Sequence, residues 1–86
     1  MRILIPTQLR SYTGGAPVVA ASGSTLAAAL DHLNASFPGI RFRIVDEQDR
    51  IRTHIRVFVN GEAAPDLTLR LTEADEVQIV GALSGG

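Results

Sequence analysis

Ile55-Arg56-Val57-Phe58-Val59-Asn60-Gly61-Glu62 is the stretch of this 86-residue chain with the strongest structural signal. From Ile55 to Val59, the apolar side chains at odd-numbered positions would all face one way, which is typical of a strand with one buried face. Asn60-Gly61 then predicts a two-residue hairpin turn, because both residues tolerate positive φ angles. Glu62 to Ala64 can return as a short strand before a proline ends it. The stretch therefore predicts a β-hairpin.

Further strands are predicted on both sides of this hairpin. Met1 to Ile5 alternates in the same way, and Ala16 to Ala21 follows a turn signal at Thr13-Gly14-Gly15. These segments predict an N-terminal hairpin with a long connection. Glu76 to Val80 is predicted as the last strand, with its odd-numbered side chains pointing inward. Additional core contacts are expected from three leucines that precede it: Leu67, Leu69 and Leu71.

One amphipathic helix is predicted between the two hairpins. Ser24 is a good N-cap candidate, because its hydroxyl can accept a hydrogen bond from a free backbone N–H group. Apolar side chains then recur at spacings of three and four, which marks one helix face: Leu26, Ala29, Leu30, Leu33 and Phe37. Pro38-Gly39 ends the helix. The charged segment from Ile40 to Thr53 is expected to be a short helix or an irregular excursion.

These elements predict an α+β fold with the order β-β-α-(excursion)-β-β-β. We expect a mixed sheet of about four to five strands with one main helix packed on one face. Residues 1–80 would form the domain, and residues 81–86 would form a flexible C-terminal tail that ends in Gly-Gly.

The second face of such a sheet must meet solvent or a partner, because a single helix covers only one face. The side chains expected there are Leu4, Arg56, Phe58 and Val80. An exposed aromatic side chain beside aliphatic ones favours a docking surface, since Phe is enriched at the cores of interfaces. The alternative is that the segment from Ile40 to Thr53 partly covers this face.

The composition argues against several classes of function. The formal net charge is −1, whereas nucleic-acid-binding proteins usually carry a basic patch or stripe. The chain has no cysteine, so it has no disulfide, thiolate metal site or catalytic thiol. No apolar stretch approaches the length of a membrane span, and we expect a cytoplasmic protein. No nucleophile has an adjacent base and no ligand set suggests a metal, so the chain is not expected to be an enzyme.

The chain ends in Ala82-Leu83-Ser84-Gly85-Gly86, directly after the last predicted strand. Two terminal glycines place no side chain near the last carbonyl group and permit backbone angles that other residues avoid. Such an end can enter a narrow tunnel and present its carboxylate to the active site of a partner. The alternative is a frayed terminus without a function, which is common at chain ends.

The arrangement and the local motifs resemble a known family. One helix on a mixed sheet, with a Gly-Gly end after the final strand, resembles the β-grasp layout of ubiquitin. The motifs are closer to the small bacterial sulfur carriers of the MoaD/ThiS family, and they occur in the same order: Gly23-Ser24-Thr25-Leu26, Phe37-Pro38-Gly39-Ile40, the hairpin from Ile55 to Glu62, Leu71 to Val77, and Gly85-Gly86. The charged segment from Arg41 to Arg52 is similar to that of CysO-like members.

The resemblance implies a carrier that acts through its chain end. A ubiquitin-activating-type enzyme would use ATP to adenylate the Gly86 carboxylate, and a sulfur donor would convert the adenylate into a thiocarboxylate. Leu83, Ser84 and Gly85 would thread the active site of the partner. The carrier itself would hold no permanent cofactor. The implied sulfur acceptor is a cysteine synthase-like enzyme, which points to cysteine biosynthesis, or the large subunit of molybdopterin synthase.

Several alternatives stay open at this point. The chain could be the small subunit of molybdopterin synthase, or it could supply sulfur to a secondary metabolite or to tRNA. In a different class, it could be a β-grasp interaction module that uses only its sheet face. It could also be a ubiquitin-like modifier that becomes attached to lysine side chains of other proteins.

Overall fold

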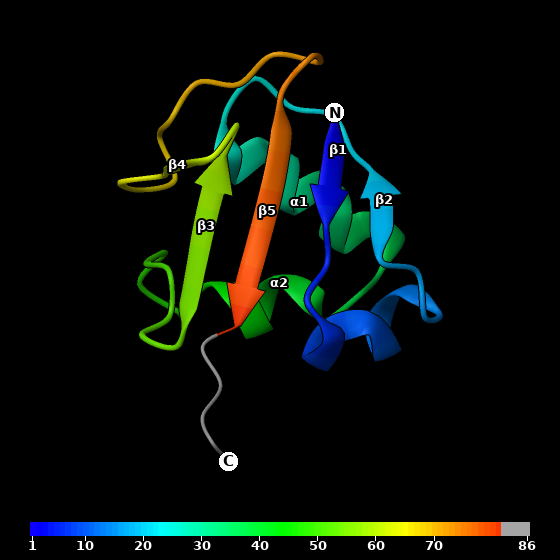
Figure 1. Ribbon diagram of the computed structural model, residues 1–86. Coiled ribbons are helices and arrows are strands. Elements are labelled where there is room, and N and C mark those ends of the chain that lie inside the picture. Colours follow the sequence, from blue (N-terminus) through cyan, green and yellow to red (C-terminus); the bar gives the residue numbers. More distant parts are fainter. Residues whose placement is uncertain (82–86) are drawn as a thin grey trace.

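Five strands form one mixed sheet in the part of the chain that the computed structural model describes, residues 1–81 (Figure 1). The strands are β1 (Arg2–Leu4), β2 (Val18–Ala20), β3 (Ile55–Val59), β4 (Glu62–Ala63) and β5 (Glu76–Gly81). Their order across the sheet is β2-β1-β5-β3-β4. The central pair β1 and β5 is parallel, and the other neighbours are antiparallel. The predicted mixed sheet and its strand order along the chain are therefore present.

The predicted hairpin forms between β3 and β4. Asn60 and Gly61 adopt φ angles of 50° and 88°, as a two-residue turn of this kind requires. The returning strand is two residues long, and Ala64 lies outside it. The last strand is one residue longer than predicted, because Gly81 still pairs with Ile55. The sheet end at Gly81 is thus the place from which the chain continues beyond the described residues.

The main helix, α1 (Leu26–Ser36), buries the predicted apolar face against the sheet. Its four buried side chains are Leu26, Ala29, Leu30 and Leu33. They meet inward-facing side chains of the central strands, among them Ile3, Val77 and Ile79, which are also buried. Figure 1 shows α1 and the short helix α2 (Ile40–Ile44) on the same side of the sheet.

The N-cap of α1 is Thr25, so the prediction of Ser24 was wrong. The Thr25 hydroxyl accepts a hydrogen bond from Ala28 N at 3.1 Å. Two further N–H groups of the first turn donate to a distant segment of the chain, Leu26 N to Leu69 O at 2.9 Å and Ala27 N to Leu67 O at 3.0 Å. Docking of that segment sets the start of the helix one residue later than local sequence indicates.

The segment from Ile40 to Thr53 is a short helix followed by irregular chain, as expected. Asn34 Oδ1 accepts hydrogen bonds from Gly39 N at 3.0 Å and from Arg41 N at 3.1 Å, which fixes the entry into α2. Ile40 and Ile44 are fully buried. A third helical segment, the 3₁₀ helix η1 (Thr7–Thr13), occupies the long connection between β1 and β2 and was not predicted.

Candidate functional site

The sheet has one face opposite α1 and α2 (Figure 1), and the strand register aligns one residue from each of the five strands in a row across this face. The register places Leu4 beside Val18 on one side and beside Gln78 on the other. Gln78 is in turn opposite Phe58, which is opposite Ala63. We call this the outer face. It is the surface on which a partner can contact strands rather than helices.

The structure brings all four side chains of the predicted docking surface onto the outer face. Leu4 and Phe58 lie in the row described above, and Arg56 is opposite Val80 in the neighbouring row. Arg56 is exposed, whereas Leu4, Phe58 and Val80 are half-buried. The four residues therefore form one surface that extends towards the end of β5. Their role in docking stays a prediction.

Two details of this surface differ from expectation. Phe58 is half-buried and not the exposed aromatic side chain that was expected. The exposed aromatic is Phe42 in α2, with 56% of its surface accessible. The excursion from Ile40 to Thr53 begins with α2 behind the sheet, so it does not cover the outer face in the way the alternative required (Figure 1).

A groove borders the outer face where β5 ends. Its walls are η1 on one side and the ends of β1 and β5 on the other, with Leu4, Gln8, Arg10, Val80 and Gly81 among its lining residues. Gln8 Nε2 donates a hydrogen bond to Gly81 O at 3.3 Å. Sequence reasoning missed Gln8, because η1 has no strong apolar period that would have signalled a helical segment. The groove leads to the last described residue of β5.

The four residues predicted to act in the chain end lie outside the described residues. They are Leu83, Ser84, Gly85 and Gly86. The site that the structure does define is therefore the surface around Gly81.

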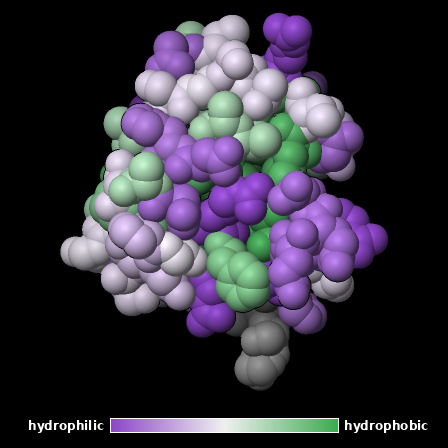
Figure 2. All heavy atoms as spheres, turned by 180° about the vertical axis from the view of Figure 1, so that it is seen from behind, coloured by the Kyte–Doolittle hydropathy of each residue, from purple (hydrophilic) through white to green (hydrophobic). Residues whose placement is uncertain are grey.

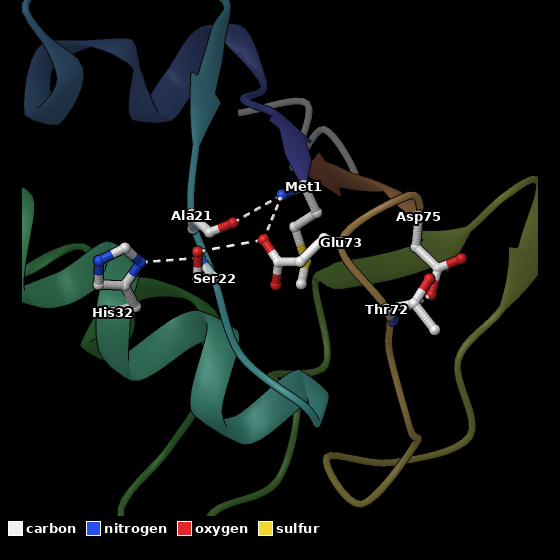
Figure 3. Close-up of polar contacts among 7 residues, drawn as sticks. All are labelled: Met1, Ala21, Ser22, His32, Thr72, Glu73 and Asp75. Atoms are coloured by element: carbon white, nitrogen blue, oxygen red, sulfur yellow. Dashed lines mark hydrogen bonds and ion pairs between the residues drawn. The ribbon is translucent and has the colours of Figure 1, made fainter.

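A polar network lies at the end of the sheet where β5 begins, opposite the end marked by Gly81 (Figure 3). Glu73 Oε1 accepts hydrogen bonds from the Met1 ammonium group at 3.3 Å and from Ser22 Oγ at 3.1 Å. These contacts hold the pKa of Glu73 below its ordinary value, the Met1 ammonium group having the larger effect. Ser22 N donates to His32 Nδ1 at 2.7 Å. His32 thus has a structural contact here.

The histidines and the acidic side chains of the excursion form no catalytic constellation within residues 1–81. His54 lies in a separate groove near Gly81, far along the chain from His32. Asp46 caps its own turn, because Oδ1 accepts hydrogen bonds from Gln48 N and Arg50 N. Within residues 1–81 there is no group of three or more His, Asp or Glu side chains suited to a metal ion. In the same range, no helix has the length and apolar character needed to cross a membrane.

Comparison with known proteins identifies the family. The family model described as "ThiS family" matches residues 3–86. The chain belongs to the ThiS family. The sulfur carrier protein CysO of Mycobacterium tuberculosis is 36% identical over 89 residues, which cover 98% of this chain and 96% of the relative.

Solved structures agree with this assignment. A chain in the crystal structure of the Amycolatopsis orientalis BexX/CysO complex matches with a TM-score of 0.91 and 33% identity, covering 99% of this chain and 98% of that one. The crystal structure of Mycobacterium tuberculosis CysO matches with a TM-score of 0.90 and 33% identity, covering 95% and 98%. The β-grasp fold and the predicted membership of a family of ubiquitin-like sulfur carriers are confirmed. Sulfur carriers of this family are small carriers and not catalysts, which agrees with the expectation that this ThiS-family protein is not an enzyme.

Proposed function

We propose that this ThiS-family protein carries sulfur as a thiocarboxylate on Gly86 and donates it as sulfide in cysteine biosynthesis. The observation that carries the proposal is the 36% identity to CysO, named as a sulfur carrier protein, along 98% of this chain. The match extends over almost the whole length of both proteins, so the similarity includes the folded body as well as the chain end.

The proposed cycle starts with a carboxylate that cannot itself be substituted by sulfur. A ubiquitin-activating-type enzyme joins the Gly86 carboxylate to the AMP part of ATP and releases pyrophosphate. A sulfide equivalent from a sulfur donor then displaces AMP and leaves a thiocarboxylate. Transfer of the sulfur to an acceptor and addition of water restore the carboxylate. In this cycle ATP is a co-substrate of the activating enzyme, and the carrier holds no cofactor of its own.

The position of β5 supports this role. Gly81 ends the strand at one extremity of the sheet, and five residues follow it in the sequence. Five residues can span at most about 17 Å when fully extended. An active site at that distance can receive Gly86 only if the partner docks close to Gly81. The carrier body then supplies positioning, which turns a bimolecular encounter into a nearly unimolecular step.

The outer face offers the partner a surface for such docking. Leu4, Phe58 and Val80 supply half-buried apolar area, and Arg56 supplies an exposed charge next to it. Apolar area with a charged rim is the common composition of protein interfaces. We assign to these four residues the contact with the activating enzyme or with the acceptor. Leu83, Ser84 and Gly85 would then thread the active site of that partner.

The acceptor in this proposal is a cysteine synthase-like enzyme, by analogy with the CysO relatives. A CysO protein forms a complex with BexX in Amycolatopsis orientalis, which supports the general idea of a carrier that docks on partners. The molybdopterin synthase large subunit is the alternative acceptor. It differs in that the carrier would be its permanent subunit, so co-purification in a fixed ratio would favour this alternative.

Intact mass spectrometry tests the proposal. The full chain is incubated with ATP, a ubiquitin-activating-type enzyme and a sulfide source. The expected product is a carrier in which one terminal oxygen is replaced by sulfur, and adding a cysteine synthase-like acceptor should return the original mass. The matched control lacks Gly86 and retains the rest of the chain, so it should dock but gain no sulfur.

The same experiment separates the other classes of function. Covalent adducts of the chain on lysine side chains of other proteins, without a thiocarboxylate, would favour a protein modifier. Partner binding that survives deletion of Gly86 with full biological activity would favour an interaction module. Either result would contradict the sulfur-carrier proposal.

A further inference from the structure

A second groove lies on the helix side of the position at which β5 ends. Its lining includes Gln8, Phe42, Arg43, Arg52, His54 and Gly81. These residues come from η1, α2, the chain before β3 and the end of β5, so four separate segments meet there. We call it the Phe42 groove. It reaches Gly81 from the side opposite the outer face, and none of the four proposed docking residues lines it.

Phe42 and Arg52 form a preorganised pair in this groove. The Arg52 guanidinium carbon lies 4.6 Å from the centre of the Phe42 ring, a cation–π contact. Arg52 Nε also donates a hydrogen bond to Phe42 O at 2.7 Å. Because these contacts use Nε and one face of the guanidinium group, they orient its remaining N–H groups. A planar guanidinium held in this way is suited to bidentate binding of a carboxylate.

The two arginines of the groove form no direct ion pair within residues 1–81, although the pKa of the Asp46 carboxyl group is lowered by the Arg50 backbone N–H and, to a smaller extent, by Arg52. Three of the eight arginines form ion pairs with carboxylates in this range: Arg2, Arg41 and Arg50. Arg43 and Arg52 have no carboxylate within the ion-pair distance of 4.0 Å in the same range. The groove therefore has two available cations, with His54 beside them, in a protein whose net charge is −1.

Acidic side chains gather at the other end of the sheet. Glu73 and Asp75 precede β5, and Glu76 begins it. Glu73 is paired there with the Met1 ammonium group and Glu76 with Arg2, whereas Arg43 and Arg52 of the groove have no such partner within residues 1–81. Figure 2 shows the helix side of the molecule, on which small hydrophobic areas are set among hydrophilic side chains. An exposed aromatic ring framed by arginines matches an acidic and partly apolar partner.

We propose that the Phe42 groove binds an acidic segment of the protein that receives the chain end. Carboxylates of this segment pair with Arg52 and Arg43, and an apolar side chain beside them covers the ring of Phe42. The identity of the partner rests on the proposed carrier function. The preference of the groove for an acidic ligand is independent of that function. An acidic segment bound in the groove would hold the partner next to Gly81. Its charge would also raise the rate at which the two proteins associate.

Nuclear magnetic resonance titration of the full chain with an oligoglutamate peptide tests the groove directly. The expected result is a set of shifts centred on the backbone amides of Phe42, Arg43, Arg52, His54 and Gly81. These shifts should weaken as salt is added, because ions screen the pairing. Arg52→Gln should weaken binding about tenfold, as expected for the loss of one strong pair.

Two further variants keep the test decisive. Arg43→Gln removes a groove cation without touching the Arg52–Phe42 contact, so it should weaken binding even if Arg52→Gln perturbs the fold. Arg70→Gln is the matched control, because Arg70 also lacks a carboxylate within ion-pair distance in residues 1–81 but lines a different groove, together with Glu62 and Asp75. Its substitution should leave the peptide affinity unchanged.

Three outcomes would overturn the proposal. The peptide could fail to bind, its shifts could spread over all arginines, or Arg70→Gln could weaken binding as much as Arg52→Gln does. A parallel titration with inorganic pyrophosphate covers the remaining ligand class: shifts with pyrophosphate but not with the peptide would assign the groove to a phosphate ligand. Formation of the thiocarboxylate on Gly86 is measured separately, so failure of one proposal does not imply failure of the other.

Discussion

The side chain of Asn60, in the β3–β4 turn, donates a hydrogen bond from Nδ2 to Asp75 Oδ1 at 2.9 Å. Asn60 Oδ1 in turn accepts one from Glu76 N at 3.0 Å, and Asp75 Oδ2 accepts one from Thr72 N at 2.8 Å. The turn residue that permits the hairpin thus also anchors the start of β5. This contact is consistent with the register of β5 against β3, in which Val59 pairs with Val77 and Ile55 with Gly81.

Asp75→Asn is expected to reduce the dependence of stability on pH. Hydrogen bonds from Thr72 N and then from Asn60 lower the pKa of the Asp75 carboxyl group. Its ionised form is therefore favoured in the folded state, and the resulting stabilisation is present above the ordinary pKa of Asp and disappears as the pH falls through the folded pKa. Thermal unfolding from about pH 6 to pH 2 should show a smaller decrease in the variant.

Glu47→Gln is the control for this measurement, because Glu47 forms no side-chain hydrogen bond or ion pair within residues 1–81. It should retain the pH dependence of the original protein. An Asp75→Asn variant with the full original decrease would show that the Asn60–Asp75 contact does not contribute.

Thr25→Ala should lower the free energy of unfolding by about 1 kcal/mol, because it removes the hydroxyl that caps α1. Thr25→Ser should restore most of this loss, since serine is an equally good N-cap. Ser24→Ala serves as the matched control at the neighbouring position and should have little effect. Chemical denaturation of the three variants measures the difference. A larger loss for Ser24→Ala than for Thr25→Ala would reverse the assignment of the cap.

Gly23→Ala should be destabilising by about 1–3 kcal/mol, the range expected for overpacking. A Cβ atom at this position would lie 2.5 Å from Ala29 N and 2.8 Å from Ala28 C, both in the backbone of α1. Backbone of a packed helix cannot move aside as a flexible side chain does. Gly14→Ala provides the comparison, because Gly14 has a positive φ but a Cβ atom added there would meet no neighbouring atom within 4 Å. Denaturation should show a larger loss at Gly23.

Arg56→Glu should slow the activation of the carrier without unfolding it. Arg56 is exposed on the outer face and has no ion-pair partner within residues 1–81, so reversing its charge acts on the partner and not on the fold. We expect kcat/KM of the activating enzyme for the carrier to fall about tenfold, equivalent to about 1.4 kcal/mol. The rate of thiocarboxylate formation, followed by intact mass, measures this effect.

Arg70→Glu makes the same charge change away from the outer face and should activate at the original rate. Equal rates for Arg56→Glu and the original protein would show that Arg56 does not contact the activating enzyme.

Much of the fold could be predicted because its signals are local. The alternation from Ile55 to Val59, the turn at Asn60-Gly61 and the apolar period of α1 each depend on residues within one element, and each prediction was confirmed. The wrong N-cap prediction concerns a choice between two similar neighbours. Ser24 and Thr25 are both good caps, and only the bonds from Leu26 N and Ala27 N to the segment around Leu67 and Leu69 select Thr25.

The candidate site shows the same division. Alternation placed Leu4, Arg56, Phe58 and Val80 on one face, but it could not show that Phe58 is half-buried. It also gave no reason to single out Phe42 within a charged stretch. The pairing of Phe42 with Arg52 across the irregular segment orients the guanidinium group over the ring.

The sequence by itself determined the strand and helix faces, the hairpin turn, the absence of cysteine chemistry and the resemblance to the ThiS family, because these properties reside in residue types and short spacings. Only the tertiary structure decided which side chains meet around Gly81. Gln8, Phe42 and Arg52 come from segments far apart in the chain, and their convergence depends on strand register and on how α2 and η1 pack. Such contacts form through the docking of whole elements, so no local pattern encodes them.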